Sequence, residues 1–208
     1  FGDWSSDVCP SDLELKSFRD ILALLKDGSH NPPNRVEAGI RFIAGATDIK
    51  DLIVQFDKCT YITKDDYDKI HKNWEIQAND ILLTIVGTIG NTAIVRESDL
   101  PFSLQRSIAV IRPIPEISHL YIYLLIKSKA FKNFLKSRTN PTGQPGIYLG
   151  TLSEYLALVP TKEVNFEFHK IQSPLFEMMQ RNIFENQILR EIRDTLLPRL
   201  MTGKIRVA

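Results

Sequence analysis

The strongest constraint on the fold of this chain is a helical stripe of apolar residues that follows Pro160. The stripe residues recur at steps of three and four, and Asn182 and Glu185 occupy the same stripe between the apolar members. The apolar members are Ile171, Leu175, Met178, Leu189, Ile192 and Leu196. Such a stripe extends past a single small domain, so it must be buried elsewhere, and a second helix packed antiparallel is the least costly solution. The sequence therefore predicts a long C-terminal helix with a partner.

Two points about this helix stay open. Ser173-Pro174 is either a cap and first helical position or a kink inside one longer helix, and the exact start of the helix is not defined by the sequence. The alternative to a partner helix is a stripe that packs wholly on its own domain.

The rest of the chain has the length and the 43% apolar composition of one domain with an appendage. We expect an amphipathic helix over Glu14–Lys26, a short helix capped by Thr63, and a helix that opens at Ser118 and continues to Phe134. The expected strands are Gly39–Gly45, Val54–Phe56, Tyr61–Ile62, Ile81–Val86, Ala93–Val95 and Ser107–Ile111, the fourth and fifth forming a hairpin. Strands and helices intermix without a βαβ period, so the predicted class is α+β.

The first thirteen residues do not continue this pattern. They contain three acidic residues and no Lys or Arg, and they resemble translated sequencing-adapter sequence, so we interpret residues 1–13 as extraneous to the fold. An ordinary flexible N-terminus is the alternative. Without them the chain has 26 basic against 22 acidic residues, compared with a net charge of +1 for the whole.

Positive charge is concentrated in one stretch. Residues 117–153 contain no acid, and they include Lys127, Lys129, Lys132, Lys136 and Arg138. A basic stripe of this kind indicates phosphate binding, although a solvated helix face explains it equally well when it is taken alone.

Catalytic motifs are incomplete. Asn31-Pro32-Pro33-Asn34 lacks the aromatic residue of the amino-methyltransferase tetrad, and Thr202-Gly203-Lys204-Ile205 lacks the Ser or Thr of a P-loop. The four histidines stand at no metal-ligand spacing, and Cys9 and Cys59 are too few for a disulfide framework. No membrane span or secretory signal is predicted, so we expect a cytoplasmic protein.

Several segments, in order, resemble the target-recognition domain of the specificity subunits of type I restriction–modification systems. Asp27-Gly28-Ser29-His30 is similar to that family's Asp-Gly-Thr-His segment, and Gly39 to Ile43 follows as its Gly-Ile-Pro-Phe strand with Arg41 in place of Pro. Asn79-Asp80-Ile81-Leu82 resembles its Gly-Asp-Ile-Leu hairpin. Gln105 to Arg112 is similar to its Gln-Ser-Ile-Ala-Val-Ile-Arg strand, with Arg106 inserted. The segment from Leu196 to Ile205 resembles the end of the family's whole subunit. Residues 161–169 depart from the family pattern.

The resemblance implies a C-terminal half of such a subunit. Residues 14–163 would form a single target-recognition domain with a mixed twisted sheet and short helices, and residues 164–208 a long helix and tail for antiparallel coiled-coil pairing. The chain would be a gene fragment or a natural half-subunit that dimerises.

The implied function is non-catalytic recognition of one half of a bipartite DNA target. Lys127, Lys132, Lys136 and Arg138 would contact phosphates. The residues expected to read bases in the major groove are Gln105, Arg106, Asn140 and Gln144. His30, in a loop before two prolines, is a further candidate for DNA binding, although a turn explains its segment equally well. Tyr148 either stacks or belongs to the core. The interface with the paired helix would contain Ile171, Leu175, Met178, Asn182, Leu189, Ile192 and Leu196.

The implied partners are double-stranded DNA, the modification subunits and through them the restriction subunit, and the other half of the specificity subunit or a second copy. S-adenosylmethionine, ATP and Mg would belong to partner subunits, with no cofactor on this chain. Two alternatives remain: a specificity domain that serves another restriction class, and a structural module whose sheet merely supports the interacting helix.

Overall fold

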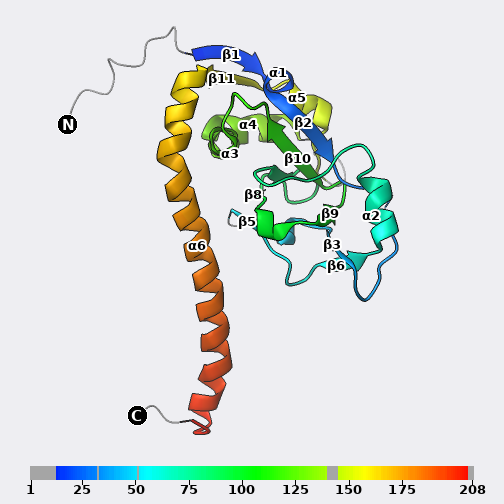
Figure 1. Cartoon of the computed structure of the whole chain (residues 1–208), viewed down its shortest axis with the longest axis vertical. Coiled ribbons are helices and arrows are strands. Elements are labelled where there is room, and N and C mark those ends of the chain that lie inside the picture. Colours follow the sequence, from blue (N-terminus) through cyan, green and yellow to red (C-terminus); the bar gives the residue numbers. More distant parts are fainter. Residues whose placement is uncertain (1–12, 32, 51, 140–144, 206–208) are drawn as a thin grey trace, which may run out of the picture. The chain divides into compact units, whose positions relative to one another are not determined.

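The computed structural model describes residues 13–31, 33–50, 52–139 and 145–205, which form an α+β body and a long C-terminal helix (Figure 1). The strands are β1 Leu13–Ser17, β2 Leu22–Asp27, β3 Ile40–Ile43, β4 Ile49–Lys50, β5 Ile53–Val54, β6 Thr60–Ile62, β7 Ile81–Thr84, β8 Thr92–Ile94, β9 Phe102–Leu104, β10 Ile108–Pro113 and β11 Leu156–Pro160. The helices are α1 Phe18–Ile21, α2 Lys64–Ile70, α3 His119–Lys127, α4 Lys129–Arg138, α5 Leu149–Ser153 and α6 Lys162–Met201. Two short 3-10 turns lie at Ala46–Asp48 and Glu97–Asp99. The predicted α+β class is confirmed.

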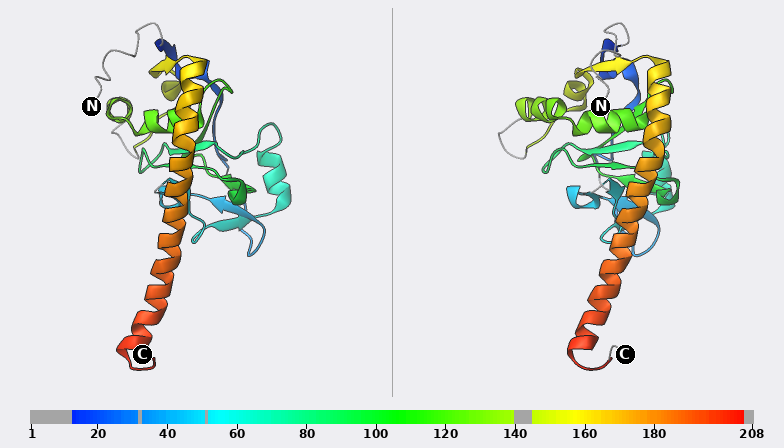
Figure 2. Two further views of the ribbon diagram at one scale, coloured as in Figure 1. Left: turned by 60° about the vertical axis from the view of Figure 1, so that its left-hand side comes forward. Right: turned by 90° about the vertical axis from the view of Figure 1, so that its left-hand side faces the viewer.

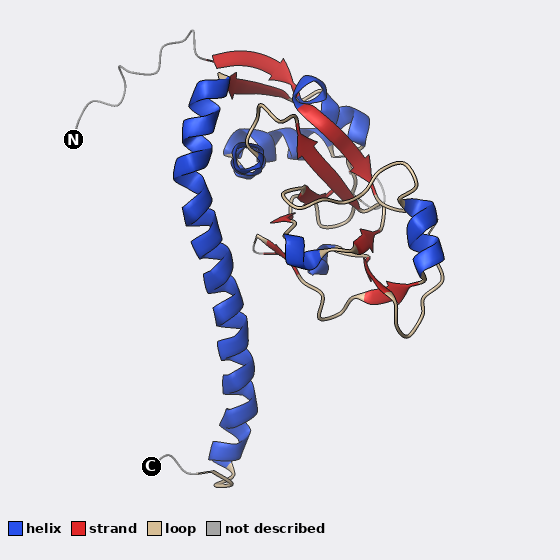
Figure 3. Ribbon diagram, in the orientation of Figure 1, coloured by secondary structure: helices blue, strands red, loops and turns tan. Residues whose placement is uncertain are grey.

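The strands of the described ranges, red in Figure 3, form four small sheets rather than one. The central sheet has the order β2-β10-β7-β8 and is antiparallel throughout. A second sheet, β6-β3-β9, is mixed, because β3 runs parallel to β9 and antiparallel to β6. Two-stranded ribbons β1-β11 and β4-β5 complete the body.

Two groups of buried side chains hold these sheets. Aliphatic residues such as Leu82 and Val110 of the central sheet pack with Phe102 and Ile43 of the mixed sheet into one cluster. Aromatic rings form the other group: Phe18 and Phe131 are fully buried and their ring centroids lie 5.6 Å apart, and Tyr155 meets both edge-on. This contact joins α1 to α4.

The predicted helix over Glu14–Lys26 is wrong. Its apolar residues fit a helical period, but β1 pairs with β11, β2 pairs with β10, and only the single turn of α1 is helical between them. Long-range strand pairing therefore overrides the local periodicity. Because β1 begins at Leu13, this residue is part of the fold and not of the excluded N-terminal segment, while residues 1–12 lie outside the described part of the chain.

The helix predicted from Ser118 to Phe134 is two helices. Ser118 caps α3 as expected, since its Oγ accepts a hydrogen bond from the Leu120 N–H. Ser128 then adopts an extended conformation, with φ −63° and ψ 155°, and its Oγ accepts from the Phe131 N–H to begin α4. The cap at Thr63 is confirmed by a bond of 3.1 Å from the Asp66 N–H.

The C-terminal helix begins at Lys162 and continues through Pro174 and Pro198 to Met201, so Ser173-Pro174 lies inside one helix (Figure 2). The chain divides into two compact units, one ending at Lys170 and one beginning at Ile171. In the described ranges, none of the helices combines the length and the apolar character that crossing a membrane requires.

Candidate nucleic-acid interface

Three loops gather at one end of the central sheet. β2 and β7 run in the same direction and end there, at Asp27 and Thr84, where the antiparallel strands β10 and β8 begin. The loops after β2 and β7 and the loop before β10 therefore leave the sheet side by side. We call residues 28–31, 85–91, 105–107 and the adjoining segment 145–148 the loop edge.

Backbone hydrogen bonds tie these loops together. The Ser29 N–H donates to the Leu104 carbonyl at 2.9 Å, and the Arg106 N–H donates to the Ser29 carbonyl at 3.2 Å. The Ile85 N–H donates to the Ser107 carbonyl at 2.8 Å. These bonds hold His30 close to Gln105 and Arg106, which the sequence analysis had selected from separate segments.

Gly28 is required for this arrangement. A Cβ at this position would lie 2.0 Å from the Leu104 carbonyl oxygen and 2.4 Å from Leu104 Cδ1, far inside van der Waals contact. The glycine of the Asp-Gly-Ser-His segment thus permits the close approach of two backbone segments.

The segment 145–148 joins the edge by two further bonds. The Gly87 N–H donates to the Pro145 carbonyl at 2.8 Å, and the Ile147 N–H donates to the Ile85 carbonyl at 2.9 Å. The next residue, Tyr148, has 78% of its surface exposed, which decides against its alternative assignment to the core. An exposed aromatic ring beside these loops is available for stacking.

The other predicted base-reading residues differ in exposure. His30 and Arg106 are exposed, and His30 Nε2 lies 2.9 Å from the Asp27 carboxylate. Gln105 is half-buried. Asn140 and Gln144 lie outside the described residues. The described candidates therefore form one group at the loop edge, in which His30, Arg106 and Tyr148 are exposed.

Thr88 was not singled out from the sequence. It lies in the turn of the predicted hairpin, where it is exposed, and its carbonyl accepts a hydrogen bond of 2.5 Å from Thr84 Oγ1. The same Thr84 Oγ1 accepts from the Asn91 N–H at 3.0 Å, which fixes the turn. A polar residue flanked by glycines at the end of a buried hairpin was the available signal.

The basic stripe lies on α3 and α4. Lys132, Lys136 and Arg138 are exposed on α4, whereas Phe131 and Leu135 on its other face are buried. Lys127, at the end of α3, is exposed with its Nζ 5.9 Å from the centroid of the Tyr123 ring. The structure therefore presents these four predicted phosphate contacts to solvent.

α4 packs against the loop edge through its buried face. A methyl group at Gly90, in the β7–β8 turn, would lie 3.8 Å from Leu135 Cδ1 of α4. The helix that carries the exposed lysines is thus a direct neighbour of one of the polar loops.

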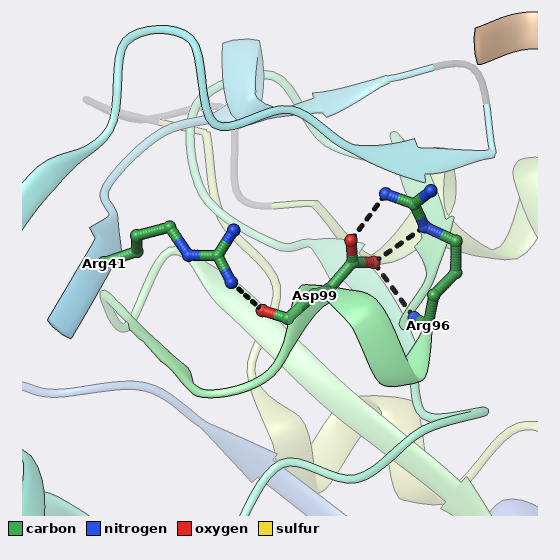
Figure 4. A network of polar contacts seen from close by, with 3 residues as sticks. All are labelled: Arg41, Arg96 and Asp99. Carbon is green, nitrogen blue, oxygen red and sulfur yellow. Dashed lines mark hydrogen bonds and ion pairs between the residues drawn. The ribbon is translucent and has the colours of Figure 1, made fainter.

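Arg41, where the resembling family has Pro, has a structural role (Figure 4). Its Nη2 donates to the Asp99 carbonyl at 2.5 Å, and its guanidinium lies 4.0 Å from the centre of the Phe56 ring. The carboxylate of Asp99 is buried and accepts hydrogen bonds from the backbone N–H and the guanidinium of Arg96. Arg41 is engaged within the protein and is not a candidate for DNA contact.

A polar cluster holds the first turns of α6. Asn165 Oδ1 accepts from the Ser118 N–H at 2.9 Å, and Ser118 Oγ lies 2.8 Å from His169 Nδ1. The neighbouring His119 is half-buried, and this desolvation together with His169 lowers its pKa to about 4. Burial also lowers the pKa of His71, whose Nε2 lies 3.0 Å from Ser103 Oγ. In the described ranges, no group of three His, Cys, Asp or Glu side chains could hold a metal ion.

The predicted helix-pairing residues all lie on α6, and their side chains are exposed. The exposed fractions of the apolar members range from 40% to 61%, so the described residues of the C-terminal unit do not cover the stripe. The residues are Ile171, Leu175, Met178, Asn182, Leu189, Ile192 and Leu196.

Known proteins share this sequence pattern and fold. Residues 23–193 match the family described as the type I restriction modification DNA specificity domain. The chain is 32% identical over 131 residues to the type I restriction enzyme HindI specificity subunit of Haemophilus influenzae, which covers 62% of this chain and 28% of that relative. It is 28% identical over 175 residues to the EcoBI specificity subunit of Escherichia coli, covering 84% and 35%.

Two solved structures have a similar fold. The S subunit of a type I restriction–modification system from M. genitalium superposes with a TM-score of 0.62 at 17% identity, covering 96% of this chain and 48% of that one. The HsdS subunit from Thermoanaerobacter tengcongensis gives a TM-score of 0.57 at 13% identity, covering 98% and 48%. The chain thus spans about a third of the curated relatives it matches and about half of the solved chains.

Proposed function

The chain belongs to the family of the type I restriction modification DNA specificity domain, and on that premise we propose that it recognises one half of a split DNA target. The observation that carries the proposal is the loop edge, where backbone hydrogen bonds hold together the segments that carry the exposed side chains of His30, Arg106 and Tyr148, next to the lysine-bearing helix α4. Polar loops next to a positive surface suit a duplex, whose base edges and phosphates lie side by side.

The two surfaces would divide the work. Lys132, Lys136 and Arg138 on α4, with Lys127, bind phosphates and set the position of the protein on the duplex. Arg106 and His30 reach base edges in the major groove, where an arginine can donate two hydrogen bonds to guanine. Tyr148 and Thr88 contact the same groove from the adjoining segments.

We further propose that the chain has no catalytic activity of its own. S-adenosylmethionine, ATP and Mg would belong to partner subunits. These partners are the modification subunits, which this chain would contact directly, and the restriction subunit, which it would reach through them. The exposed stripe of α6 would pair antiparallel with the other half of a specificity subunit or with a second copy, which sets the distance between two recognition domains.

If α4 binds phosphates and the loop edge reads bases, variants of the two surfaces should behave differently. Lys132→Ala with Lys136→Ala should weaken binding to all duplexes about equally and reduce the slope of log affinity against log salt by about 1.8, or 0.9 for each lost phosphate contact. Arg106→Ala should instead lower the preference for the target over other sequences by about 1–3 kcal/mol. Fluorescence anisotropy over a range of salt concentrations measures both effects.

A matched control is available on α2. Lys64→Ala with Lys69→Ala also removes two exposed helical lysines, but these lie 3.1 Å and 3.6 Å from Asp68 and Asp66. Because their charge is locally balanced, the salt slope should not change. A structural module would show no salt-dependent duplex binding in any variant, and that result would exclude the proposed function.

A further inference from the structure

The spacing of the stripe residues on α6 is symmetric: it reads the same from the first residue as from the last. From Ile171 to Leu196 the steps are four, three, four, three, four, three and four residues, with Asn182 and Glu185 as the central pair. In two antiparallel copies, each stripe residue therefore meets its mirror-related partner, so that Leu175 lies opposite Ile192. The apolar steps repeat every seven residues, but only one register places Asn182 and Glu185 of the two copies against each other, and its centre lies between Ile183 and Phe184.

Charge complementarity supports this register. Glu185 occupies a stripe position, and the register places it near Asn182 and Arg181 of the other copy. The next charged stripe position is Arg199, which this register places opposite Phe168 of the other copy. Glu167 of that copy is therefore its neighbour, as Arg181 is the neighbour of Glu185. Both charged stripe positions thus face an opposite charge, which removes much of the cost of placing them in a helix interface.

The stripe also continues toward the body. Phe168 and Val164 precede Ile171 by the same steps of three and four residues, and Val164 is 46% exposed. The Phe168 ring meets the Tyr121 ring edge-on at 5.9 Å, and the Tyr121 hydroxyl donates to the Leu158 carbonyl of β11. The stripe therefore leads directly to the β1-β11 ribbon.

One face of that ribbon is apolar and exposed. Leu15 of β1 lies opposite Leu158 of β11, and Leu156 lies two residues before Leu158 on the same face. Their exposed fractions are 63%, 54% and 57%, whereas Ala157 and Val159, which alternate with them, are buried. Three clustered leucines on a surface indicate a docking site.

The end of α6 is also apolar and exposed. Leu197, Leu200 and Met201 are exposed there, and the chain then turns at Gly203, which has φ +68°. In the register above, Arg199 lies at the level of Phe168 in the other copy, and Gly203 lies at the level of Val164. The residues that end one helix thus reach the ribbon of the other copy.

We propose that the ribbon leucines Leu15, Leu156 and Leu158, together with Val164 and Phe168, dock the end of α6 from a second copy of this chain. The proposal rests on the helix pairing in the proposed function and extends that interface onto the recognition body. Each two-fold dimer contains two such contacts, one at each end of the paired helices.

The first experiment tests the register by disulfide formation. In a chain with Cys9→Ser and Cys59→Ser, the pair Leu175→Cys and Ile192→Cys should form a covalent dimer under mild oxidation, whereas Leu175→Cys alone should not. A covalent dimer from the single cysteine would show a parallel pair. That result, or the absence of a covalent dimer from both, would overturn the proposal.

The second experiment tests the docking surface. Leu156→Lys with Leu158→Lys should raise the dimer dissociation constant at least tenfold in sedimentation equilibrium, and Leu200→Lys with Met201→Lys should do the same. Leu124→Lys is the matched control, because Leu124 is an exposed leucine of α3 outside the surface, and it should change the constant less than twofold.

The combined variant distinguishes contact from coincidence. If the two patches touch, joining both pairs of substitutions should weaken the dimer by less than the product of the separate effects. An unchanged dimer dissociation constant for Leu156→Lys with Leu158→Lys would mean that the leucine face of the β1-β11 ribbon binds a different partner, and it would overturn the docking proposal. Such a result would leave the register and the DNA affinity of the chain intact, so it would not count against the proposed function.

Discussion

Replacing Gly28 by alanine tests how the loop edge is held together. The added Cβ would lie 2.0 Å from the Leu104 carbonyl oxygen, so the two backbone segments must separate by about 1 Å to reach even the closest contact that real Cβ atoms make. This shift breaks the bond from Ser29 to Leu104 and the bond from Arg106 to Ser29. Two lost hydrogen bonds cost about 2 kcal/mol, and strain adds about 1 kcal/mol or more.

A loss of about 3 kcal/mol should lower the melting temperature by roughly 6–12 °C in a domain of this size. Differential scanning calorimetry measures the shift. Gly150→Ala is the matched control, because nothing lies within 4 Å of a Cβ there and the residue is in α5, where alanine is the better helix former. Equal melting temperatures for the two variants would refute the packing argument for Gly28.

Three further predictions concern other parts of the chain. Asp99→Ala removes the buried carboxylate that accepts two hydrogen bonds from the Arg96 guanidinium, and it should destabilise the domain by about 2–4 kcal/mol, which urea denaturation measures. Because the pKa of His119 is lowered to about 4, the folded form binds fewer protons than the unfolded form below about pH 6.5. The free energy of unfolding should therefore keep its full value above that pH and fall by up to about 3 kcal/mol toward pH 4. His119→Gln should flatten this pH dependence in denaturation curves. Leu189→Asp with Ile192→Asp should make the chain monomeric in sedimentation while circular dichroism shows a folded body, and a wild-type chain that is monomeric at high concentration would contradict the helix pairing.

Features fixed by local chemistry were predictable from the sequence. The cap at Thr63, the β7–β8 hairpin and the long helix depend on residues close together in the chain, and the structure contains all three. The helix over Glu14–Lys26 was wrong because its strands pair with β10 and β11, which lie far along the chain and leave no local signal. The break at Ser128 was missed because apolar residues continue at helical spacing on both sides of it.

The candidate site was predicted only where a local sequence pattern reveals it. A run of sequence without acids was sufficient to find Lys132 and Lys136, which are exposed as expected. The grouping of His30 with Arg106 depended on the family resemblance, because only the folded sheet brings these two loops together. Thr88 was not identified, since a turn residue shows its exposure and its neighbours only after folding.

The central claim is that the loop edge reads DNA sequence. The most direct measurement is selection of bound duplexes from a random pool by the purified chain, repeated with Arg106→Ala at the same salt concentration. The account predicts that the wild type enriches a short defined motif, and that the variant still binds DNA but loses the preference at one or two base pairs of that motif. Enrichment of the same motif with unchanged preference at every position, or no enrichment by the wild type, would contradict it.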